Sequence, residues 1–150
     1  MTNTATTRTF DGFTDDERAA MKEHAEELKT AARRSPRTAK ADGEQDVLAK
    51  IAGMEPADRA LAERLHALVK AAAPSLTPRL WYGMPAYAKD GKVLCFFQSA
   101  QKFKSRYATL GFSDVAALDD GALWPTTYAL TTLTPAVESH LTALLTRATA

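Results

Sequence analysis

The sequence is poor in cysteine, in net charge and in long apolar runs, and each shortage excludes a class of protein. A single cysteine, Cys95, cannot form an internal disulfide, so a disulfide-held scaffold is excluded and a cytoplasmic location is expected. A net charge of +1 gives no overall electrostatic case for binding nucleic acid. No apolar run approaches the roughly 20 residues that span a bilayer, and residues 1–10 lack the apolar core of a secretory signal.

Local catalytic motifs are missing as well. The chain has no G-x-S-x-G elbow, no Gly-rich phosphate loop, no H-E-x-x-H and no C-x-x-C. Cys95 stands in an apolar run with no histidine nearby in the sequence, and a reactive thiol needs a cationic or helix-N-terminal setting that lowers its pKa, so we expect Cys95 to be buried and unreactive. These absences predict a non-enzymatic protein.

The first half of the sequence predicts three helices. Thr14 and Glu17 have the spacing of a capping box, and a narrow apolar stripe follows, by which an amphipathic helix would pack against a core: Met21, Ala25, Leu28 and Ala32. Asp42 is expected to cap a second helix, which carries Val47, Leu48, Ile51 and Met54. The third runs from Pro56 to Pro74 with a buried face of Leu61, Leu65, Leu68, Val69 and Ala72.

From Trp81 onward the pattern changes to strands. Asp90-Gly91 is a strong hairpin signal, because both central residues of a type I′ turn need positive φ. Strands are expected at residues 86–89, 92–98, 106–110 and 126–131, and a last helix after the N-cap Thr134. In the second strand both faces are apolar, which indicates a central position.

The expected fold is therefore α+β: an antiparallel β-meander of about four to five strands packed with N-terminal helices and a C-terminal helix. Residues 1–13 are expected to form a flexible tail, residues 14–42 an N-terminal helix and linker, and residues 43–150 the α+β domain. The whole chain is expected to form one compact domain.

Three features suggest sites for ions. Glu63 and His66 have the Glu-x-x-His spacing of di-iron bundles, but only one copy is present, which favours a chance match on a solvated helix face. Acidic groups at residues 15–17 and 119–120 could hold hard cations, although capping and turn formation explain them more simply. A cationic cluster, Arg33, Arg34, Arg37 and Lys40, could grip phosphate but is more typical of a helix C-terminus and linker. No metal site is assigned.

A candidate ligand site combines aromatic and cationic residues. Lys102, Lys104 and Arg106 alternate, so an extended chain would point all three the same way. The candidate residues are Trp81, Tyr82, Met84, Tyr87, Lys102, Lys104, Arg106 and Tyr107. Such a strip suits a small anion or a nucleic acid, whereas the alternative is a sheet edge that lysines protect from further strand pairing. The aromatic residues could equally belong to the core.

The segment Tyr82-Gly83-Met84-Pro85-Ala86-Tyr87, followed by Asp90-Gly91-Lys92 and an apolar strand, resembles the YdhG-like family of domains of unknown function. The resemblance covers roughly residues 44–147 and implies a compact α+β domain with an antiparallel sheet. Some family members are described as frataxin-like intracellular iron chaperones, which implies weak iron binding through exposed carboxylates. Two functions thus stand as expectations: an iron-binding protein, or a module for a small anionic molecule.

Overall fold

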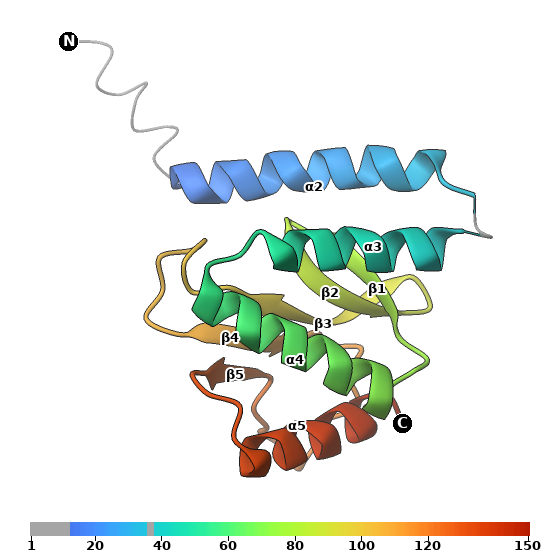
Figure 1. Ribbon diagram of the computed structural model, residues 1–150. Helices are drawn as coiled ribbons and strands as arrows, with labels where there is room; N and C mark the ends of the chain where they lie inside the picture. Colours follow the sequence, from blue (N-terminus) through green and yellow to red (C-terminus); the bar gives the residue numbers. More distant parts are fainter. Residues whose placement is uncertain (1–12, 36–37) are drawn as a thin grey trace.

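The computed structural model describes residues 13–35 and 38–150, which form an α+β fold (Figure 1). Its elements, in chain order, are α2 (Asp15–Arg33), α3 (Ala39–Ala52), α4 (Pro56–Ala72), β1 (Thr77–Trp81), β2 (Met84–Lys89), β3 (Lys92–Gln98), β4 (Ala108–Phe112), β5 (Thr127–Leu130) and α5 (Pro135–Ala148). The predicted tail lies outside the described residues except for Phe13, and so do Pro36 and Arg37.

The sheet is the expected antiparallel meander, with five strands in the order β1-β2-β3-β4-β5. Strand β1 was not predicted, because Pro78 interrupts its pattern; as an edge strand it tolerates a proline, which cannot donate to the ladder. Strand β4 begins at Ala108, two residues later than expected. The central strand β3 is buried from both sides, since both Leu94 and Cys95 have 0% exposure.

Two tight hairpin turns connect the first three strands. Asp90 (φ 51°) and Gly91 (φ 82°) form the predicted turn between β2 and β3. A second turn of the same kind, between β1 and β2, consists of Tyr82 (φ 52°) and Gly83 (φ 76°). Positive φ at both positions is what a type I′ turn requires, and it is uncommon for a tyrosine. The YGMP segment is thus a hairpin turn that leads into β2.

Helices α3, α4 and α5 lie on one side of the sheet, and the core fills the space between (Figure 1). The predicted buried faces of α4 and α5 are largely confirmed, with Leu65 and Leu145 among the most buried side chains. Burial also raises the pKa of the Cys95 thiol to about 12, as an unreactive core cysteine requires. None of the helices in the described part of the chain combines the length and apolar character that a membrane crossing needs.

Helix α3 begins earlier than predicted and packs closely on β1. It starts at Ala39, after Thr38, so Asp42 lies in its first turn and the expected boundary between residues 42 and 43 falls inside the helix. A Cβ at Gly43 would collide with the carbonyl oxygen of Pro78, so only glycine allows the helix this close to the strand. Val47 faces the core as expected, whereas Leu48 is 46% exposed.

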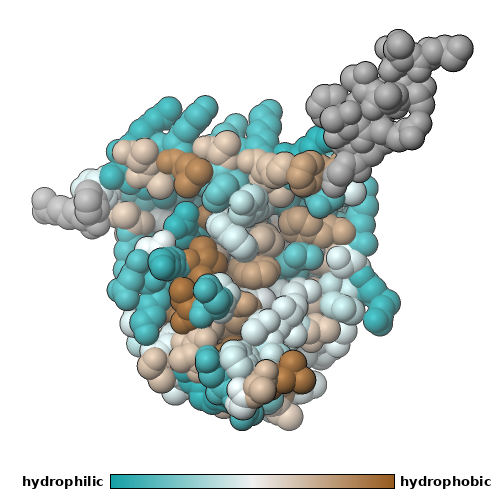
Figure 2. All heavy atoms as spheres, turned by 180° about the vertical axis from the view of Figure 1, so that it is seen from behind, coloured by the Kyte–Doolittle hydropathy of each residue, from teal (hydrophilic) through white to brown (hydrophobic). Residues whose placement is uncertain are grey.

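The N-terminal helix α2 presents the opposite face to that predicted. Its capping box is confirmed, but the predicted packing stripe points to solvent: Met21 is 39% exposed, Leu28 is 52% exposed, and both alanines of the stripe are exposed. Figure 2 shows tan and brown spheres along the upper edge of the molecule, where α2 lies. The helix turns its polar face inward because carboxylates on that face meet cations and free amides of the domain beneath.

Candidate functional site: the cleft beneath α2

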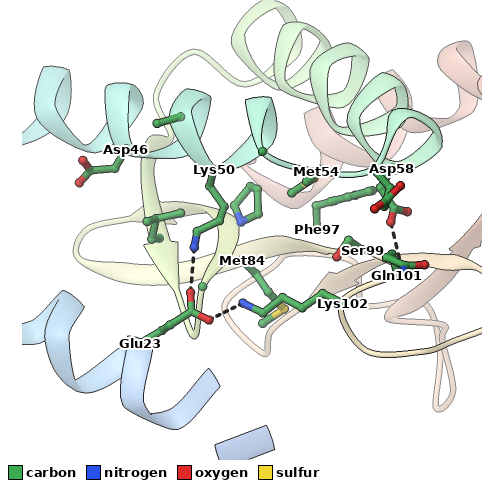
Figure 3. A pocket seen from close by; sticks show the side chains of 16 residues that line it. Glu23, Asp46, Lys50, Met54, Asp58, Met84, Phe97, Ser99, Gln101 and Lys102 are labelled. Carbon is green, nitrogen blue, oxygen red and sulfur yellow. Dashed lines mark hydrogen bonds and ion pairs between the residues drawn. The ribbon is translucent and has the colours of Figure 1, made fainter. Parts of the chain in front are cut away.

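A cleft of about 650 Å³ opens between α2, α3 and the β1–β2 turn (Figure 3). Its walls include apolar side chains from the segment after α3 and from the first three strands, namely Met54, Leu80, Met84, Pro85 and Phe97. Its polar lining consists of Glu23, Asp46, Lys50, Glu55, Asp58, Ser99, Gln101 and Lys102. An apolar hollow with a few convergent polar groups is the usual form of a small-molecule site.

Two lysines converge on one carboxylate at the mouth of this cleft. Lys50 Nζ of α3 lies 2.9 Å from Glu23 Oε2, and Lys102 Nζ, from the loop after β3, lies 2.8 Å from Glu23 Oε1 (Figure 3). Burial raises the pKa of Glu23, but the hydrogen bonds from Lys102 and Lys50 outweigh it, so that the pKa is lowered overall. Two cations share one anion, so this triad keeps a net positive charge.

The β1–β2 turn forms a second anion site beside the first. In a two-residue hairpin turn, both central N–H groups point out of the ladder. Here Tyr82 N and Gly83 N donate to the two carboxylate oxygens of Glu27, at 2.9 and 2.7 Å. The ring of His24 stacks on Tyr82 with 4.0 Å between centroids and 11° between planes. Successive backbone amides that converge on one anion are a recurring binding device.

Buried Asp58 fixes the loop that carries Lys102. Its two carboxylate oxygens accept from Ala100 N and Gln101 N, both at 3.0 Å. Asp58 stands in the first turn of α4 and is 4% exposed, so these two N–H groups and the positive end of the helix stabilise its carboxylate. Asp58 therefore positions the loop that brings Lys102 to the cleft.

The carboxylates that line the cleft do not make it a cation site. Three of the four are already engaged: Glu23 by two lysines, Asp58 by two amides, and Asp46 by Arg34 at 2.6 Å, which leaves Glu55 alone. Among the described residues, no group of three or more histidine, cysteine, aspartate or glutamate side chains could hold a metal ion. Arg34, one of the predicted phosphate-gripping cations, is thus already engaged by a carboxylate.

The structure brings together only half of the candidate ligand residues. Trp81, Tyr82, Met84 and Lys102 gather around the cleft and its turn, with the Trp81 ring edge-on to Tyr82 at 5.0 Å. The other four candidates, Tyr87, Lys104, Arg106 and Tyr107, lie elsewhere. Tyr87 is in the core, and Lys104 pairs with Asp16 at 3.4 Å. Arg106 lies over the Tyr107 ring.

The expectation that three alternating cations form one strip is wrong. Residues 101–104 form a turn rather than a strand, and Lys104 has a φ of 53°. Period-two alternation applies only to an extended chain. Lys102 therefore points to the cleft, while Lys104 is 81% exposed beside the N-terminal end of α2.

The Glu-x-x-His pair is also split. His66 is buried, in contrast to the solvated face we expected, whereas Glu63 is exposed. His66 Nε2 lies 2.9 Å from Glu44, and Nδ1 lies 2.8 Å from the Tyr87 hydroxyl. Since a carboxylate only accepts, Nε2 carries the proton, and in the neutral ring Nδ1 accepts from Tyr87. This pairing locks α4 to β2 and leaves no free ligand for a metal.

Sequence reasoning missed the residues that complete the cleft: Glu23, His24, Glu27, Lys50 and Asp58. The one available signal was the spacing of Glu23 and Glu27, which places two carboxylates on one face of a helix. Nothing local indicated that this face packs inward. No protein-family model matches the chain, and neither the curated proteins nor the solved structures yield a match.

Proposed function

We propose that this protein binds a small anionic molecule in the cleft beneath α2. The observation that carries the proposal is the convergence of Lys50 and Lys102, from separate elements, at the mouth of an apolar-walled cleft. Their ammonium groups would pair with the anionic group of the ligand. Met54, Met84 and Phe97 would contact its apolar part.

The net charge of the lysine pair favours an anion over a cation. Both lysine side chains are partly buried, with exposures of 36% for Lys50 and 27% for Lys102, and Glu23 supplies one negative charge between them. A partly desolvated ion pair is screened less by salt than one on the open surface. An incoming phosphate or carboxylate would therefore compete with Glu23 for these two ammonium groups.

Titration calorimetry with inorganic phosphate and with benzene-1,4-dicarboxylate tests this function. We expect binding that weakens at high salt and is strongly reduced in Lys50→Gln and Lys102→Gln. Lys92→Gln, at an exposed lysine at the start of β3, is the matched control and should bind like the wild type. Equal binding in all three variants would place the anion elsewhere, and absence of heat with both probes would remove the proposal.

Iron delivery, the activity implied by the YdhG-like resemblance, remains a prediction without a ligand set on the described residues. Anaerobic titration with ferrous iron is the direct test. Saturable heat at a fixed stoichiometry would support it, and the absence of heat would leave the anion-binding module as the surviving function.

A further inference from the structure

We infer that α2 occupies the anion site as an internal ligand, and that the external ligand carries two anionic groups beside a flat aromatic ring and binds by displacing α2. This inference rests on the proposed function and names the ligand class and the regulation of the same site. It follows from what α2 inserts, from the polar character of its other contacts, and from its tether to α3.

The inward face of α2 presents a carboxylate, a flat ring and a second carboxylate. Each meets a complementary group of the domain: Glu23 meets two lysines, His24 lies flat on the Tyr82 ring, and Glu27 meets two turn amides. All of these receptor groups belong to α3, the β1–β2 turn and the loop after β3. Side chains four apart on a helix have Cβ atoms about 5–6 Å apart, so the two anion sites are close enough for one small molecule.

The remaining attachments of α2 are mostly polar and lie at its ends, where Asp16 pairs with Lys104 at 3.4 Å and Arg34, just after the helix, pairs with Asp46 at 2.6 Å. Ala20 is its one buried residue, and its apolar stripe faces solvent. A second cleft, of about 440 Å³, also opens between α2 and the α3–β1 surface and shares Lys50 and Leu80 with the first. A helix held mainly by partly exposed polar contacts belongs to the parts of a protein that open at low free-energy cost. An external anion could take over the same donors.

The short connection to α3 makes α2 a permanent competitor. Residues 34–38 alone separate the end of α2 at Arg33 from the start of α3 at Ala39. A group tethered this closely acts at a high effective concentration. The apparent affinity for an external ligand is therefore the intrinsic affinity multiplied by the fraction of molecules in which α2 is undocked.

Weakening α2 should tighten binding of the external ligand. The test uses the full chain, with benzene-1,4-dicarboxylate as the two-anion probe and inorganic phosphate as the one-anion probe. In Glu23→Gln/Glu27→Gln the internal carboxylates are lost, while every receptor group remains. If α2 is docked about 90% of the time, the double variant should bind the dicarboxylate about tenfold more tightly. Lys29→Gln, at an exposed position of the same helix that lines neither cleft, should bind like the wild type.

Hydrogen exchange supplies the second readout. In the wild type, saturating dicarboxylate should accelerate exchange of the α2 amides and leave β2 and β3 unchanged, with phosphate less effective at matched saturation. In the single variant Glu27→Gln, the affinity for the dicarboxylate and the exchange rate of the α2 amides should lie between those of the wild type and the double variant. This variant keeps the test valid if the double variant misfolds.

The outcomes separate the two proposals. Binding that is no tighter in the double variant, with unchanged or slower α2 exchange on binding, would overturn the displacement mechanism and leave the anion site standing. Tighter binding of phosphate alone would overturn the two-anion ligand class. If neither wild type nor double variant binds any probe, the proposed function fails and this inference fails with it.

Discussion

Removing the hydroxyl of Tyr87 should destabilise the fold, because it breaks the buried link between β2 and α4. Tyr87 is 1% exposed, and burial, above all, raises the pKa of its hydroxyl, so it remains protonated and donates to His66. In Tyr87→Phe the ring and its packing stay, while Nδ1 of His66, a side chain that is largely buried, loses its partner.

The size of the effect follows from the cost of an unsatisfied buried acceptor. Such a group typically costs about 1–3 kcal/mol, more than the roughly 1 kcal/mol net value of an average hydrogen bond. For a chain of 150 residues, each kcal/mol shifts Tm by about 2–4 °C. We therefore expect Tyr87→Phe to lower the free energy of unfolding by about 1–3 kcal/mol and Tm by a few degrees or more.

Urea unfolding followed by far-UV circular dichroism measures this change. Tyr107→Phe is the matched control, since that ring is 36% exposed and its loss of a hydroxyl should stay within about 0.5 kcal/mol. Combining Tyr87→Phe with His66→Phe should cost less than the sum of the two single changes, because both break the same bond. A Tyr87→Phe variant as stable as the control would refute the reasoning.

Three further predictions concern the site and the core. Gly83→Ala should loosen α2, because the new Cβ would collide with Glu23 and Lys102. Gly91→Ala, at a similar φ but in open space, should cost only the backbone strain of about 1 kcal/mol. Hydrogen exchange of the α2 amides should be faster in the first variant and unchanged in the second. The contribution of Glu23 to the docking of α2 should be complete above its ordinary pKa of 4.5 and should be lost as the pH falls through its lowered pKa in the folded protein. The amide NMR shifts of α2 measure this loss, and shifts that persist unchanged to pH 2 would contradict it. Cys95 should react with thiol reagents slowly in the native state and rapidly once unfolded, and fast native labelling would contradict its burial.

Local chemistry made much of the fold predictable. The capping box of α2 forms as expected, with Glu17 N 3.0 Å from the Thr14 hydroxyl. Asp90-Gly91 forms the expected turn, because positive φ is a property of the residues themselves. Strand β1 escaped because Pro78 weakens its pattern, and its identity as a strand depends on pairing with β2.

The site was largely unpredictable because its contacts join distant segments. Lys102 meets Glu23 across 79 positions of sequence, and Gly83 meets Glu27 across 56. Periodicity showed that α2 has an apolar face but assumed that this face would be buried. The sheet and the other helices already enclose a core, so the polar contacts decide which way α2 turns.

The shallow seating of α2 affects which measurements can detect its departure. Unfolding heat capacity and denaturant sensitivity both scale with the surface that becomes exposed, and α2 covers little apolar surface. Its release would therefore leave calorimetric and urea transitions nearly unchanged. The Trp81 indole lies edge-on to Tyr82, the ring on which His24 stacks, so its environment would change; in a Trp124→Phe background it provides an intrinsic fluorescent reporter. Heating curves thus follow the sheet and its three packed helices, whereas emission from Trp81 follows α2.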